Sequence, residues 1–171
     1  MSKILTSALL GVALIATAAC TKKRPDTVLP PSEQGPGTGD PNGNGNGDEI
    51  GGPLNDQFKR EVLSNTVHFA FDQFDIDDEA RRILDSQAQW LRAHPQARIT
   101  IEGHCDERGT REYNLALGDR RANGAKNYLA ARGISPDRIT TISYGKERPI
   151  ALGSDDSSWA QNRRAVTIVI S

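Results

Sequence analysis

The sequence predicts an α+β domain in which helices cover one face of a four-stranded mixed sheet, preceded by a disordered tether. Three observations favour this fold class. Short segments rich in β-forming residues recur along the C-terminal part of the chain, segments between them repeat apolar residues at helical spacing, and the composition changes near residue 54. The resulting element order, βαβαββ, is typical of helices packed on one side of a sheet.

The first twenty residues have the composition of an export signal. Lys3 gives a short basic region, and residues 4–15 form an apolar stretch that is too short to span a bilayer. Three small residues then precede Cys20, an arrangement that resembles a bacterial lipobox. We therefore expect a signal peptide over residues 1–19 and acylation of Cys20 by diacylglycerol and palmitate. The alternative is an ordinary signal peptide with an incidental cysteine.

A polar segment follows over residues 20–53. It is dominated by Pro, Gly, Asn and Asp, and eight of the sixteen glycines in the chain fall between Gly35 and Gly52. A stretch with so few large apolar side chains cannot offset the entropy that is lost on ordering. We expect a disordered tether that carries the lipidated Cys20 at one end and a domain over residues 54–171 at the other.

The first half of this domain predicts one strand and one helix. Residues 66–71 combine partial alternation with β-forming side chains, which indicates a strand. Asp77 and its acidic neighbours begin a helix, and His94-Pro95 ends it. The apolar positions of this helix recur at helical spacing, at Ala80, Ile83, Leu84, Ala88 and Leu91.

A second strand and helix follow in the same order. Residues 98–102 alternate cleanly between apolar and polar side chains and predict a strand that Gly103 ends. Residues 110–132 predict a long helix that Gly133 closes. Its apolar and small residues form one stripe, made of Leu115, Gly118, Ala122, Ala125 and Leu129.

The last part of the chain predicts two further strands. Residues 139–144 form the third strand, and the apolar run at residues 165–170 indicates a buried final strand. Residues 157–162, between them, predict a short helical turn. These elements complete the four strands of the sheet.

Composition and cysteine use exclude several classes of function. The formal net charge is -1 and no basic run stands out, so the chain lacks the charge pattern of a nucleic-acid-binding protein. Two cysteines and three scattered histidines lack the spacing of metal ligands, and we expect neither a metal nor a cofactor. If Cys20 is lipidated, Cys105 has no disulfide partner, and the apolar core alone must stabilise the domain.

Four motifs occur in the order and spacing of a known family. They are HFAFDQFDID (residues 68–77), IEGHCDERGTREYNLALGDRRANGAKNYL (residues 101–129), ISYGKERP (residues 142–149) and NRRAV (residues 162–166). Over residues 66–171 the chain resembles the OmpA-like peptidoglycan-binding domain, and within that family it looks like the peptidoglycan-associated lipoproteins of the Tol-Pal system. The resemblance implies an OmpA-like fold. Cys105 is a departure, because relatives more often carry Ala or Thr there.

The chemistry of a peptidoglycan stem peptide indicates which side chains would bind it. Diaminopimelate displays an ammonium and a carboxylate at one end, so its receptor needs an anion and a cation close together. Asp106 and Arg121 fit those roles, because a guanidinium can bind a carboxylate through two hydrogen bonds. At about 100° per residue, Asn114, Leu117 and Arg121 share one flank of the predicted helix, beside the preceding loop.

The resemblance implies the same pair, Asp106 and Arg121, as the groups that bind diaminopimelate. One of the two arginines at 163 and 164 is expected to approach the carboxylates of the ligand, and Arg163 is taken as that residue. The other is expected to carry a solvated or sheet-edge charge. The resemblance also implies contacts from the acidic loop after the first strand, at Asp72, Gln73, Phe74 and Asp75. A structural alternative stays open, in which Asp106 and Arg121 form a salt bridge that pins the loop to the helix.

The resemblance further implies a non-catalytic protein that tethers the outer membrane to the cell wall and serves envelope integrity and cell division. Its implied partners are peptidoglycan, TolB and other Tol proteins, and outer-membrane lipid through Cys20. Thr21 after that cysteine resembles the sorting pattern of outer-membrane lipoproteins facing the periplasm. The alternatives are a cell-wall hydrolase and an OmpA-like domain of another envelope machine. Catalysis by His104 and Cys105 is disfavoured, because adjacent strand residues point to opposite faces.

Overall fold

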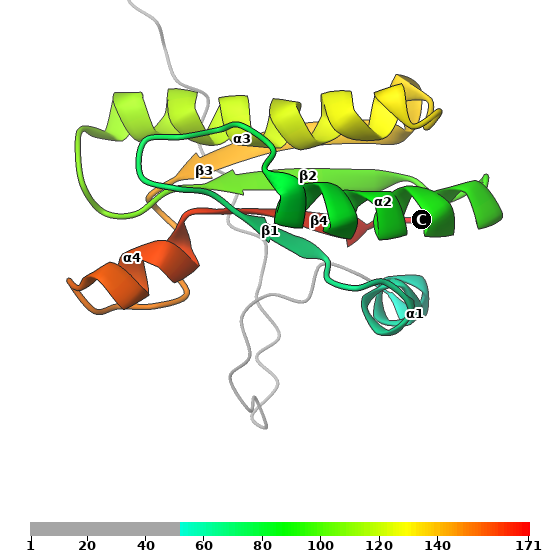
Figure 1. Cartoon of the computed structure of the whole chain (residues 1–171), viewed down its shortest axis with the longest axis horizontal. Coiled ribbons are helices and arrows are strands. Elements are labelled where there is room, and N and C mark those ends of the chain that lie inside the picture. The colour runs from blue at the N-terminus through cyan, green and yellow to red at the C-terminus, as the bar shows by residue number, and fades with distance from the viewer. Residues whose placement is uncertain (1–51) are drawn as a thin grey trace, which may run out of the picture. The chain divides into compact units, whose positions relative to one another are not determined.

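The computed structural model describes residues 52–171 (Figure 1). The predicted signal peptide, Cys20 and the predicted tether up to residue 51 lie outside the described residues. The described elements are α1 (Pro53–Glu61), β1 (Thr66–His68), α2 (Asp78–Ala93), β2 (Ile99–His104), α3 (Arg111–Ala131), the 3-10 turn η1 (Pro136–Arg138), β3 (Ile139–Gly145), α4 (Asp156–Asn162) and β4 (Arg164–Val169).

The four strands form one mixed sheet in the order β1-β4-β2-β3. β2 and β3 are parallel, and β4 runs antiparallel to both of its neighbours, β1 and β2. The long helices α2 and α3 lie on one face of this sheet (Figure 1). The predicted α+β fold, with helices on one face of a four-stranded mixed sheet, is therefore confirmed.

Side-chain caps fix where the helices begin. The carboxylate of Asp77 accepts a hydrogen bond from the backbone N–H of Ala80 at 2.8 Å, which starts α2. The hydroxyl of Thr110 accepts from the N–H of Tyr113 at 3.2 Å, which starts α3. At the other end of α3, Gly133 has a φ of +89°, the left-handed conformation that ends helices at glycine. The two predicted helices thus have the limits that their sequence signals indicate.

The core lies between the two long helices and the sheet. Its largest fully buried side chains come from both layers, and they include Leu84, Leu91, Ile99, Ile101, Leu129 and Ile134. Each fully buried aliphatic side chain of this size contributes roughly 1.5–3 kcal/mol by leaving water. Most of the apolar positions that predict the helices and strands therefore lie in this core.

Helix α1 closes one end of the core and is not among the elements predicted from the sequence. The fully buried ring of Phe58 packs edge-on against Trp90 of α2, with 5.0 Å between ring centroids. The side chain of Asn55 accepts a hydrogen bond from the N–H of Val169 at 3.0 Å. A helix of nine residues is too short to be stable by itself in water, so the helical state of α1 depends on these tertiary contacts. In Figure 1, α1 lies at the opposite end of the domain from α4 and from the loops that follow β1 and β2.

Two strand limits differ from the predictions by more than one residue. β1 ends at His68 and not near residue 71, because the chain beyond it leaves the sheet to form a loop. β2 does not stop at Gly103 but continues to His104, with a register irregularity between these two residues. Gly103 is therefore part of the strand, and its role is a close contact with α3.

The contact between Gly103 and Gly118 sets the distance between β2 and α3. A Cβ atom on Gly103 would lie 1.9 Å from the carbonyl oxygen of Gly118. A Cβ atom on Gly118 would lie 2.3 Å from the hydroxyl of Ser143 on β3. Only glycine at both positions allows the helix to lie this close to the sheet, which brings the N-terminal half of α3 to the ends of β2 and β3.

We predict that Gly103→Ala lowers the free energy of unfolding by about 3 kcal/mol, because the added methyl group forces α3 away from β2. Chemical denaturation of the purified protein measures the change. The matched control is Gly52→Ala, because nothing lies within 4 Å of a Cβ atom at that position. Equal effects of the two substitutions would contradict the role given to Gly103.

Candidate functional site

A pocket of about 170 Å³ lies at the end of the domain that contains the β1–α2 and β2–α3 loops. Both loops and the first turns of α3 contribute side chains to it. The lining residues are Phe71, Asp72, Cys105, Asp106, Arg108, Gly109, Tyr113, Asn114, Leu117 and Arg121. Five of these residues, from separate parts of the chain, are also predicted from the sequence to bind a ligand. They are Asp72, Asp106, Asn114, Leu117 and Arg121.

Arg121 is fully buried beneath this pocket. Its Nε donates to the carbonyl oxygen of Gln73 at 2.9 Å and its Nη1 to that of His104 at 2.8 Å. Its Nη2 donates to the carbonyl oxygen of Ala70 at 3.3 Å, and the guanidinium lies over the ring of Phe69. Burial lowers the pKa of Arg121, but a guanidinium stays protonated at neutral pH. Arg121 thus connects the β1–α2 loop to the end of β2.

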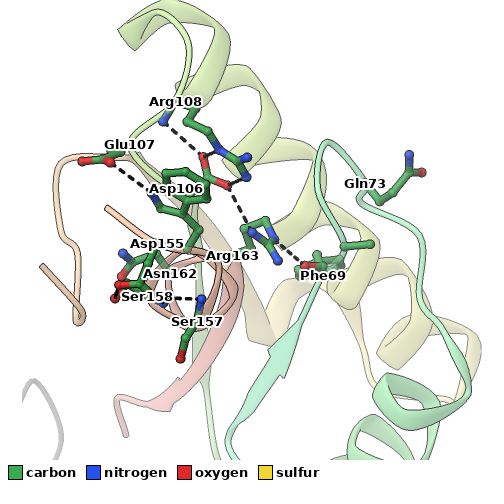
Figure 2. A network of polar contacts seen from close by, with 12 residues as sticks. Phe69, Gln73, Asp106, Glu107, Arg108, Asp155, Ser157, Ser158, Asn162 and Arg163 are labelled. Carbon is green, nitrogen blue, oxygen red and sulfur yellow. Dashed lines mark hydrogen bonds and ion pairs between the residues drawn. The ribbon is translucent and has the colours of Figure 1, made fainter. Parts of the chain in front are cut away.

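Asp106 is the buried anion of the site. Its carboxylate accepts two side-chain hydrogen bonds from Arg108, at 2.6 Å and 3.2 Å, and one from Arg163 at 3.3 Å (Figure 2). Burial alone would raise the pKa of Asp106, but the hydrogen bonds and charge of Arg108 and the hydrogen bond from Arg163 hold that pKa below its usual value. The salt bridge between Asp106 and Arg121 that the sequence left open is not formed.

Asn114 and Leu117 lie on α3 beside the pocket, as the helical spacing predicts. The buried side chain of Asn114 donates to the carbonyl oxygens of Arg108 at 2.7 Å and Thr110 at 3.0 Å. These two bonds hold the β2–α3 loop against the first turn of α3. Leu117 is also buried and gives the pocket an apolar wall.

The predicted residues of the β1–α2 loop separate into two groups. Asp72 lines the pocket, has a φ of 59° and accepts a hydrogen bond from the hydroxyl of Tyr113. Asp residues tolerate this left-handed conformation better than most, and such positions are frequent in binding loops. Phe74 and Asp75 do not line the pocket, and the ring of Phe74 packs instead beneath the guanidinium of Arg120.

Arg108 lines the pocket but is not among the site residues predicted from the sequence. Its guanidinium lies between two aromatic rings, 4.2 Å from the centroid of Phe71 and 4.0 Å from that of Trp159. The only signal in the sequence was its place two residues after Asp106, a spacing at which an arginine in a loop can fold back onto a carboxylate. Phe71 and Tyr113 were missed for a similar reason, since exposed aromatic residues carry no periodic signal.

His104 and Cys105 do not act on each other. The thiol of Cys105 donates to the carbonyl oxygen of Asn114 at 3.3 Å, and the ring of His104 stacks on Tyr144. Burial raises the pKa of the Cys105 thiol, which disfavours the thiolate that a nucleophile requires. Within residues 52–171 no cluster of His, Cys, Asp and Glu could hold a metal ion.

Comparison with known proteins places this geometry in a family. The family model described as OmpA family matches residues 68–163, which include the pocket and the loops that form it.

The chain belongs to the OmpA family.

Two relatives with the same name show how far this similarity extends. The peptidoglycan-associated lipoprotein of Haemophilus influenzae is 40% identical over 166 residues, which cover 97% of this chain and 98% of that protein. The peptidoglycan-associated lipoprotein of Brucella melitensis is 53% identical over 107 residues, which cover 63% of this chain and 64% of the relative. The match to the Brucella protein therefore spans less than two thirds of its length.

A solved structure agrees with the OmpA-family fold. The crystal structure of the peptidoglycan-associated lipoprotein from Burkholderia pseudomallei aligns with 62% of this chain and 90% of its own, with 45% sequence identity and a TM-score of 0.61. Among the helices in the described part of the chain, none has the length and apolar character needed to cross a membrane.

We predict that Arg121→Lys lowers the free energy of unfolding of this OmpA-family domain by about 3 kcal/mol. A single ammonium cannot reach all three carbonyl oxygens, and those left without a donor stay buried. Arg120→Lys is the control, because Arg120 is exposed and its guanidinium lies over the ring of Phe74 and not among buried carbonyl oxygens. Thermal and urea denaturation of both variants measure the difference, and a loss below about 1 kcal/mol for Arg121→Lys would contradict the bridging role.

Proposed function

We propose that this protein is a non-catalytic, lipid-anchored receptor of the outer membrane that binds the peptide part of peptidoglycan. The observation that carries the proposal is that a buried anion, Asp106, and a buried cation, Arg121, line the same pocket. Diaminopimelate offers the matching pair of charges at one end. The relatives support this proposal through their name, peptidoglycan-associated lipoprotein.

The pocket provides complementary chemistry for such a ligand. The carboxylate of Asp106 would accept from the ligand's ammonium, and the N–H groups that Arg121 does not use for carbonyl oxygens would donate to its carboxylate. Arg163 adds a second positive charge beside Asp106. The apolar side chain of Leu117 would contact the methylene groups between the two charged ends. In this proposal Asp72 lies at the rim of the site, whereas Phe74 and Asp75 support the loop.

Non-covalent binding fits these groups better than catalysis. Asp106 is held ionised by Arg108 and Arg163, so it is a poor proton donor at neutral pH. The Cys105 thiol has no base within reach that the described contacts reveal. A binder changes neither the glycan nor the peptide, and it would retain the cell wall without releasing fragments from it.

The similarity to peptidoglycan-associated lipoproteins supports a wider role for the protein. We propose that the protein joins the outer membrane to the cell wall as part of the Tol-Pal system, with TolB and other Tol proteins as partners. In this role it would serve envelope integrity and cell division. The proposed organisation is a signal peptide over residues 1–19, a lipidated Cys20 with a tether to residue 53, and the peptidoglycan-binding domain over residues 54–171.

We predict that Asp106→Asn weakens binding of a diaminopimelate-containing stem peptide by about tenfold to a hundredfold, because the ligand's ammonium loses its counter-charge. Isothermal titration calorimetry measures the affinity. The control is Glu107→Gln, which removes one charge from the same loop at a residue that does not line the pocket. Unchanged binding by folded Asp106→Asn would refute this site, and release of soluble fragments from purified sacculi by the wild-type protein would favour a hydrolase instead.

We predict that Cys20→Ser abolishes acylation, because the serine hydroxyl does not replace the thiol that receives diacylglycerol. Mass spectrometry of the protein extracted from membranes detects the acyl chains, and fractionation shows whether the variant leaves the outer membrane. Cys105→Ala is the control, because this thiol is buried in the domain. Acyl chains on the Cys20→Ser protein would rule out the proposed anchor.

A further inference from the structure

The carboxylate of Asp106 has no free acceptor position. Its Oδ1 accepts from the backbone N–H of Arg108 at 3.1 Å and from the Nε of Arg108 at 3.2 Å. Its Oδ2 accepts from the Nη2 of Arg108 at 2.6 Å and from the Nη1 of Arg163 at 3.3 Å. A carboxylate offers about four such positions, so a ligand ammonium can bind Asp106 only if a resident donor leaves.

We propose that the side chain of Arg108 occupies the cation-binding position at Asp106 and is displaced when a ligand ammonium binds there. This inference rests on the proposed function and adds that Arg108 competes with the ligand for Asp106, which we call self-competition. Arg108 would then limit the affinity of the empty pocket, and the ligand would have to replace an internal cation with its own.

The contacts of the two arginines indicate which of them leaves. Arg163 is anchored by a second hydrogen bond, from its Nε to the carbonyl oxygen of Phe69 at 2.9 Å (Figure 2), and its side chain is 14% exposed. The side chain of Arg108 is 34% exposed, and its described hydrogen bonds all go to Asp106. Arg108 also belongs to a loop, whereas Arg163 directly precedes β4. Arg108 is therefore the donor that can move at lower cost.

Two aromatic rings make the displacement of Arg108 feasible. Its guanidinium lies between the rings of Phe71 and Trp159, at 4.2 Å and 4.0 Å from their centroids. A cation–π contact of this kind is modestly favourable at a partly exposed site. A guanidinium that leaves the carboxylate can keep contact with these rings as it turns toward solvent. The environment of the Trp159 ring therefore depends on whether Arg108 is bound to Asp106.

Self-competition has a measurable consequence. The apparent dissociation constant of a ligand increases by the inverse of the fraction of protein whose site is open. A partly exposed ion pair such as Arg108–Asp106 favours the closed state only modestly. Removing the Arg108 side-chain donors should therefore tighten binding by roughly threefold to tenfold, whereas a residue that contacts the ligand would weaken binding when it is removed.

The test compares the full-length wild-type protein with Arg108→Met and Arg111→Met by titration calorimetry with a diaminopimelate-containing tripeptide. Methionine keeps the length of the side chain but supplies neither charge nor donor. Arg111 lies three residues further along, pairs with Glu147 and does not line the pocket, so its substitution controls for the lost charge. We expect tighter binding for Arg108→Met and unchanged binding for Arg111→Met.

Fluorescence of Trp159 supplies the second readout. Peptide binding should change this emission in the wild-type and Arg111→Met proteins, as Arg108 shifts on the indole, and should leave it unchanged in Arg108→Met. Trp90 is buried next to α1 and contributes the same background to all three proteins. Weaker or equal binding by folded Arg108→Met, with wild-type binding intact, overturns the proposed displacement. No binding by any of the three overturns the proposed function itself.

Discussion

The site depends on one buried charge, the guanidinium of Arg121. A charge in the interior is costly unless hydrogen bonds replace its lost water, and here three backbone carbonyl oxygens do so. Two of those oxygens belong to the β1–α2 loop and the third to the last residue of β2. The loop must therefore fold over α3, which explains why β1 stops early and why Asp72 reaches the pocket.

Local patterns in the sequence predict most of the fold, because strands and helices bury side chains at fixed spacing. The exceptions follow from contacts that have no period. Helix α1 depends on the fit of Phe58 against Trp90, and the continuation of β2 through Gly103 depends on a glycine of another element, Gly118. Neither contact can be inferred from neighbouring residues, since each joins segments far apart in the chain.

The site was predictable in part for similar reasons. Helical spacing places Asn114, Leu117 and Arg121 on one flank of α3, and all three line the pocket. The hydrogen-bond partners of Asp106 are not predictable from helical spacing, because they depend on small differences in side-chain distance within loops. Asp106 therefore pairs with Arg108 and Arg163 and not with Arg121. Three of the four hydrogen bonds to Asp106 come from side chains, which can rotate away, whereas Arg121 donates to backbone carbonyl groups of the β1–α2 loop and of β2.

The position of α1 has a mechanical consequence. The chain enters the domain at Pro53, at the end remote from the pocket (Figure 1). A force applied between Pro53 and a ligand in the pocket would act along the whole domain and would load α1 first. The contacts that hold α1 are chiefly the packing of Phe58 and the hydrogen bonds of Asn55 and Glu61, whereas the sheet is held by three strand pairs. Unwinding these nine residues would lengthen the chain by roughly 15–20 Å while the pocket stayed folded. Under load, α1 can therefore lengthen the connection to the binding site.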